Sequence, residues 1–217
     1  MKALLAALLL ASTAVRADLV IVQKVVAAGQ SGEQTIRIKG DLARTDLAPE
    51  ISMISNAATG DSITLRHASR TFLKVSAADA KKMLEKLQKR RPADAPPPVL
   101  TATGKKEKIG RHECELFTTS FGGMAVSYWI AKGYPNFPAV LAQMEKLQAG
   151  SVSAMGRGLM PELKDFPGLP IRTELELGGQ KITTVLLSVR EEDVVPASFE
   201  IPPGYEEVTA PVPELPK

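Results

Sequence analysis

The feature that most limits the fold is a succession of short Val- and Ile-rich segments separated by turn residues. These segments are residues 19–28, 35–39, 51–55, 62–67 and 70–75, and their connections are short and polar. Such segments are typical of strands, and connections this short cannot hold a crossover helix. The first part of the chain therefore predicts an antiparallel meander rather than alternating strands and helices.

The second half of the chain repeats this plan. Strands are predicted over residues 99–103, 108–119, 124–131, 171–177, 182–189 and 198–201. The clearest hairpin joins 171–177 to 182–189 through Gly178 and Gly179. A sheet of this size curls and needs its concave face covered. We therefore expect a mainly β (α+β) fold: one strongly curved antiparallel sheet of about nine or ten strands, with two helices covering the concave face.

Two segments have helical periodicity. Residues 77–91 follow Ser76, which with Asp79 resembles an N-cap pair, and a second helix begins after Asn136. If the helices form a lid, their apolar stripes contact a ligand; the candidate ligand-binding residues are Met83, Leu84, Leu87 and Met144. The alternative is that both stripes pack on the sheet as ordinary core.

The predicted helix 77–91 is also basic, with six Lys and Arg residues against Asp79 and Glu85. This charge fits either a solvent-exposed helix back or a surface that meets an anionic membrane or an acidic partner. The whole chain has a net charge of only +3, which does not favour a nucleic-acid partner.

The N-terminus has the pattern of a signal peptide over residues 1–17. Lys2 precedes an uncharged apolar run, and small residues surround Arg16. The run is too short for a stable membrane span. We expect a protein that is soluble after cleavage and periplasmic or secreted, with a single domain over 18–205 and a proline-rich tail over 206–217.

Catalytic motifs are not found in the sequence. There is no G-x-S-x-G motif, and the chain has one cysteine, Cys114, and two histidines, His67 and His112. These three side chains are potential metal ligands if the sheet brings them together, or core residues if it does not. We expect no enzyme activity, no cofactor and no metal, and a hydrolase or metal-dependent enzyme is the least favoured alternative.

Four motifs in order resemble a known family: GKKEKIGRHECE (104–115), YWIA (128–131), PGLPI (167–171) and FEIPPGY (199–205). They resemble a family of exported bacterial domains of unassigned function that is grouped with the LolA/LolB lipoprotein carriers. The resemblance implies a half-barrel with helices across its mouth and an apolar cavity. LolB-type proteins are lipid-anchored through an N-terminal cysteine, and this chain has none there.

Two functions are consistent with these features. The first is binding or carriage of an apolar ligand, a lipid or an acylated protein, in a cavity between sheet and helices. The second is a non-catalytic envelope interaction protein whose core is filled. The size and lining of the space beneath the helices distinguish them.

Overall fold

The computed structural model describes residues 18–47, 49–88, 98–121, 124–149 and 160–209. Twelve strands form one sheet. They are β1 (Leu19–Ala27), β2 (Gln30–Lys39), β3 (Leu42–Leu47), β4 (Ile51–Asn56), β5 (Ser62–Arg66), β6 (Thr71–Val75), β7 (Thr101–Ile109), β8 (His112–Phe121), β9 (Met124–Ala131), β10 (Leu169–Leu177), β11 (Gln180–Glu191) and β12 (Glu206–Glu207). The helices are α1 (Ala77–Gln88) and α2 (Phe137–Met144), with 3-10 turns η1 (Glu145–Ala149), η2 (Leu163–Asp165) and η3 (Pro196–Phe199).

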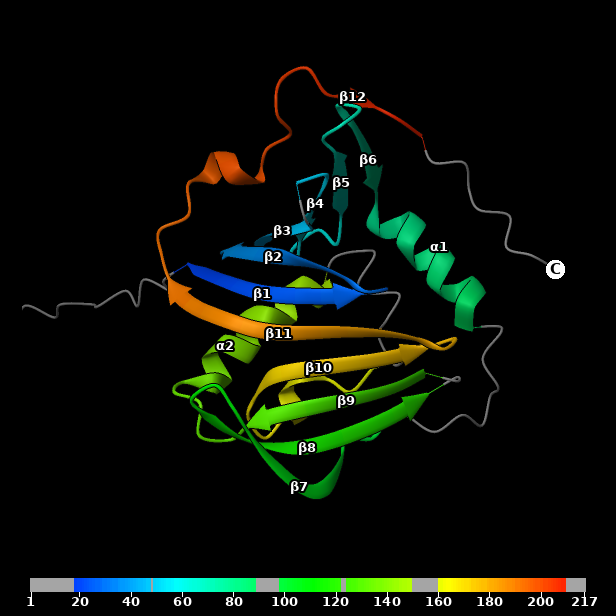
Figure 1. The fold of residues 1–217 in the computed structure, drawn as a ribbon. Helices are drawn as coiled ribbons and strands as arrows, with labels where there is room; N and C mark the ends of the chain where they lie inside the picture. The colour runs from blue at the N-terminus through cyan, green and yellow to red at the C-terminus, as the bar shows by residue number, and fades with distance from the viewer. Residues whose placement is uncertain (1–17, 48, 89–97, 122–123, 150–159, 210–217) are drawn as a thin grey trace, which may run out of the picture.

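The strand order is β12-β6-β5-β4-β3-β2-β1-β11-β10-β9-β8-β7, so two meanders meet where β1 pairs with β11. Every pairing is antiparallel except that of β12 with β6. The sheet curves across its width, and its outer strands β12 and β7 do not meet (Figure 1). The expected mainly β fold, a curved antiparallel sheet with two helices, is confirmed.

The number of strands is higher than expected because two short ones were missed. β3 is rich in polar residues, and β12 falls in the segment expected to be a proline-rich tail. The amides of Glu206 and Val208 donate to the carbonyls of Arg70 and Phe72, which holds this segment against β6.

Two of the expected strands were wrong in detail. Residues 108–119 are divided between β7 and β8, because Gly110 adopts a φ of 57° and turns the chain. Residues 196–199 form the turn η3 instead of a strand.

The helices begin where the sequence predicts. The hydroxyl of Ser76 accepts a hydrogen bond from the amide of Asp79 and donates one to its carboxylate, so the N-cap pair of α1 is confirmed. Asn136 precedes α2 in a left-handed conformation, with φ of 51°, but its side chain makes no capping bond. In Figure 1, α1 continues from β6 at the side of the sheet, whereas α2 lies behind the central strands.

The sheet is covered on opposite faces in its two halves. On one face, Val140 and Leu141 of α2 pack with Ile21 and Ile130 of the central strands. On the other face, the segment 194–208, which we call the C-terminal strap, covers β3–β6. Its residues Val194 and Phe199 form a second core with Val20, Ile54, Leu65 and Phe72. Alternation along β1 explains the split, because adjacent residues such as Val20 and Ile21 point to opposite faces.

Candidate functional site

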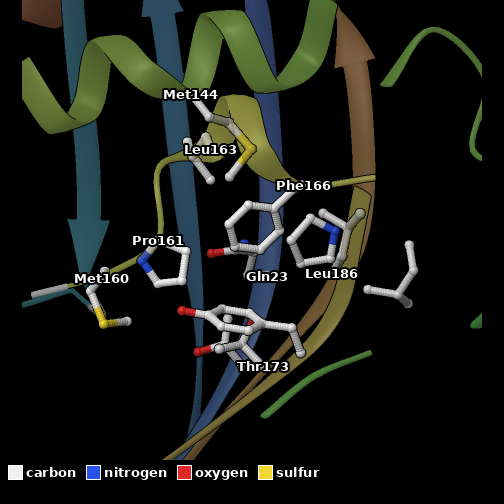
Figure 2. A pocket seen from close by; sticks show the side chains of 12 residues that line it. Gln23, Met144, Met160, Pro161, Leu163, Phe166, Thr173 and Leu186 are labelled. Atoms are coloured by element: carbon white, nitrogen blue, oxygen red, sulfur yellow. The ribbon is translucent and has the colours of Figure 1, made fainter. Parts of the chain in front are cut away.

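A pocket of about 210 Å³ lies between the sheet and the segment that contains α2 and η2. Figure 2 shows Met144 and Leu163 on one side and Thr173 on the opposite side. Of the twelve described residues that line it, eight are apolar and four are polar but uncharged. The lining residues are Gln23, Tyr128, Met144, Met160, Pro161, Leu163, Phe166, Pro170, Ile171, Thr173, Thr184 and Leu186.

The strand register places the polar residues close together on the floor of the pocket. Thr173 of β10 is directly opposite Thr184 of β11 and Tyr128 of β9. Side chains in such cross-strand pairs lie on the same face and contact each other. Gln23 of β1 is opposite Leu186, the residue two positions after Thr184. Four adjacent strands therefore each contribute one polar side chain to the same pocket.

None of the described residues that line the pocket carries a charge. Among them Tyr128 is the one titratable residue, and burial raises the pKa of this phenol to about 12. The ring of Tyr128 is fixed edge-on against Phe166, with ring centres 5.0 Å apart. At neutral pH the site therefore offers apolar surface and neutral hydrogen-bonding groups.

Met144 is the one predicted ligand-binding residue that lines this pocket. The side chains of Met83, Leu84 and Leu87 lie outside the described residues. Sequence reasoning missed the four polar residues, although the pattern held a signal for two of them. Thr173 lies between Ile171 and Leu175 on the apolar face of its strand, and the two-residue turn at Gly178-Gly179 places Thr184 opposite it.

A second polar cluster lies beneath the C-terminal strap. Ser52 is buried; its Oγ lies 2.6 Å from Oδ1 of Asp46, 2.7 Å from Nε2 of His67 and 3.0 Å from a guanidinium nitrogen of Arg44. The single hydroxyl proton of Ser52 goes to Asp46, so His67 donates from Nε2. In the neutral ring with its proton on Nε2, Nδ1 of His67 accepts from the hydroxyl of Tyr205, 2.6 Å away. Because Ser52 gives its proton to the carboxylate, His67 does not activate it as a nucleophile.

Arg44 extends this cluster to the strap. It donates from Nε to Asp46 at 2.7 Å and from a terminal nitrogen to the carbonyl of Ser198 at 2.9 Å. Arg37 also pairs with Asp46. Burial by itself raises the pKa of Asp46. The hydrogen bonds from Ser52 and Arg44, with the charges of Arg44 and Arg37, outweigh burial and lower the pKa below its ordinary value of 3.8. The cluster fastens the strap to the sheet.

His112 and Cys114 lie far from His67 in the strand order, since seven strands separate β5 from β8. His112 stacks on Tyr134, with ring centres 5.1 Å apart. Cys114 is buried, and burial raises the pKa of its thiol. Within the described residues, no three His, Cys, Asp or Glu side chains are arranged to hold a metal ion.

A family model described as a domain of unknown function, DUF4412, matches residues 20–205, which run from β1 through most of the strap. The chain belongs to the DUF4412 family. This confirms the resemblance to a family of unassigned function. The DUF4412 match includes both the pocket and the cluster beneath the strap. No curated protein matches the chain.

Solved structures match the DUF4412 chain only distantly. PNGF-II is 11% identical over 89% of this chain, with a TM-score of 0.43, and this chain spans 31% of it. A DUF1329 family protein from Desulfovibrio piger is 10% identical, covers 84% of this chain and 89% of its own, and has a TM-score of 0.33. A LolA superfamily protein from Nitrosomonas europaea is 9% identical, with coverages of 85% and 89% and a TM-score of 0.21.

The predicted signal peptide, residues 1–17, lies outside the described residues. Among the helices that are described, none has the length and hydropathy needed to span a membrane.

Proposed function

We propose that this DUF4412 protein is an exported, non-enzymatic binding protein that holds an apolar ligand segment in the pocket between the sheet and α2. The observation that carries the proposal is the lining, whose described residues include eight apolar ones and no charged one. Concave, mostly apolar sites with a few polar groups are typical of small-molecule binding. The export part of the proposal rests on the N-terminal sequence pattern.

The size of the pocket limits what enters it. At about 210 Å³ it exceeds an engineered cavity of ~150 Å³ that binds benzene. It is smaller than the ~300–1,000 Å³ of pockets that enclose drug-sized ligands. Beside the pocket, buried side chains such as Ile21, Ile130 and Leu141 pack together beneath α2. The proposed occupant is therefore the end of an acyl chain or a small apolar molecule, with the rest of a larger lipid outside.

The experiment is solvent extraction of the purified protein followed by mass spectrometry, combined with titration of a neutral naphthyl fluorophore. We expect a co-purified apolar compound or saturable binding of the fluorophore that medium-chain alcohols displace. The absence of both would contradict the proposal.

A second candidate function is supported by exposed basic side chains. Lys81 and Lys82 are exposed on α1, and Lys105, Lys106 and Lys108 are exposed on the edge strand β7. Exposed basic side chains of this kind favour an anionic membrane or an acidic protein. Flotation with phosphatidylglycerol vesicles tests this function. Lys81→Glu with Lys82→Glu should weaken membrane binding, and binding that is unchanged by the reversal and by salt would contradict it.

A further inference from the structure

We propose that the pocket selects the uncharged polar group of its ligand, a hydroxyl or an ester or amide carbonyl joined to an alkyl chain, and rejects an ionised head group. This inference rests on the proposed function, because it names the chemical class of the ligand for the same pocket. The four polar residues on the pocket floor are the observation that supports this class of ligand.

Three of these residues form a row across the sheet. Tyr128, Thr173 and Thr184 are successive cross-strand partners on β9, β10 and β11. Adjacent strands are ~4.8 Å apart, so the row spans about 10 Å. A ligand hydroxyl or carbonyl that lies over this row therefore meets a polar side chain at each of three successive strands.

These polar side chains are available to a ligand. Within the described part of the chain, Gln23, Tyr128, Thr173 and Thr184 make no side-chain hydrogen bond to another residue. Together they offer hydroxyl and amide groups that can both donate and accept. A ligand hydroxyl or carbonyl can therefore exchange its bonds with water for bonds with the protein.

An ionised ligand group would lose its hydration in this pocket without meeting an opposite charge on the described residues. In the described part of the lining, no residue is Lys, Arg, His, Asp or Glu, and the high pKa of Tyr128 keeps its phenol neutral. Burying a carboxylate, phosphate or ammonium group without an opposite charge costs several kcal/mol. A purely apolar ligand avoids that cost but leaves the polar row without partners.

The test compares hexanol, hexanoate and hexane by calorimetry and by amide chemical-shift changes at neutral pH. We expect hexanol to bind at least tenfold more tightly than hexanoate. Thr173→Val combined with Thr184→Val should weaken hexanol binding about tenfold and leave hexane binding unchanged or stronger, because valine keeps the shape and strand preference of threonine. Tyr128→Phe is an independent second variant, expected to act in the same direction.

Thr183→Val is the matched control, because Thr183 lies on the same strand and points to the opposite face. Two results would overturn the inference while leaving the proposed function intact. The first is equal binding of hexanoate and hexanol, and the second is hexanol binding that neither the double variant nor Tyr128→Phe weakens. If none of the three compounds binds, both the inference and the proposed function fail.

Discussion

The hydroxyl of Tyr205 lies 2.6 Å from Nδ1 of His67, although 138 positions separate the two residues. This bond joins the C-terminal strap to the turn between β5 and β6. Through Ser52 and Asp46 it continues into β4 and β3. The strap is therefore held by polar contacts as well as by the apolar contacts of Phe199.

Removing the Tyr205 hydroxyl tests the contribution of this bond. Tyr205→Phe should lower the free energy of unfolding by about 1 kcal/mol, because Nδ1 of His67 loses its donor. Urea denaturation followed by circular dichroism measures the change. Tyr134→Phe is the control, since its ring stacks on His112; an equal loss in both variants would contradict a specific role for the Tyr205 bond.

The Asp46 carboxylate should make stability fall at low pH. The pKa of Asp46 is lower in the folded chain than the ~3.9 of an unfolded aspartate. The ionised carboxylate therefore stabilises the fold above about pH 4, and this stabilisation is lost as the pH falls through the pKa of the folded state. Asp46→Asn should cost about 2 kcal/mol at neutral pH, and the difference from wild type should shrink on acidification. A constant difference down to pH ~2 would contradict this account; the exposed Asp41→Asn is the control.

Cys114 should react with thiol reagents only after unfolding. The side chain is 2% exposed, and burial raises its pKa, so little thiolate is accessible in the native state. Labelling with a chromogenic disulfide under native conditions should be slow and should follow the unfolding rate in urea. Rapid labelling of the native protein would show that the β7–β8 region opens independently.

Gly168 should not tolerate a side chain. A Cβ at this position would lie 2.4 Å from the carbonyl oxygen of Ala131 and 2.7 Å from Cα of Lys132, both of which are backbone atoms. Gly168→Ala should therefore lower the free energy of unfolding by about 2 kcal/mol or more. Gly133→Ala, where a Cβ meets nothing within 4 Å, should be near neutral in the same thermal unfolding assay; equal stabilities would refute the close approach.

The elements that depend on a local pattern of apolar, polar and turn residues could be predicted from the sequence. In the β10–β11 hairpin, charged residues alternate with uncharged ones over residues 171–177, and both residues of the Gly178-Gly179 turn have positive φ. β3 could not be predicted in this way, because Arg44 and Asp46 point into a polar cluster and break the expected apolar alternation. Their partners Ser198 and Ser52 come from other elements.

The pocket was predictable only in outline. An apolar helix stripe containing Met144 predicts contact with the sheet, but the pocket depends on which residues face each other across strands. The two-residue turn at Gly178-Gly179 fixes the register that pairs Thr173 with Thr184, whereas a single sequence does not specify which residues of β9 and β1 lie beside this hairpin. The cluster of Ser52, His67 and Tyr205 likewise depends on tertiary contacts over long sequence separations.

Filling the pocket tests the central claim most directly. Met144→Trp places a larger side chain in the pocket, whereas Ala142→Trp places the same residue on the exposed side of α2. The measurement is the affinity of each variant for the neutral naphthyl fluorophore, with thermal unfolding to verify the fold. We predict that Met144→Trp loses at least tenfold in affinity and that Ala142→Trp binds like wild type. Equal affinity of the two folded variants would contradict ligand binding in this pocket.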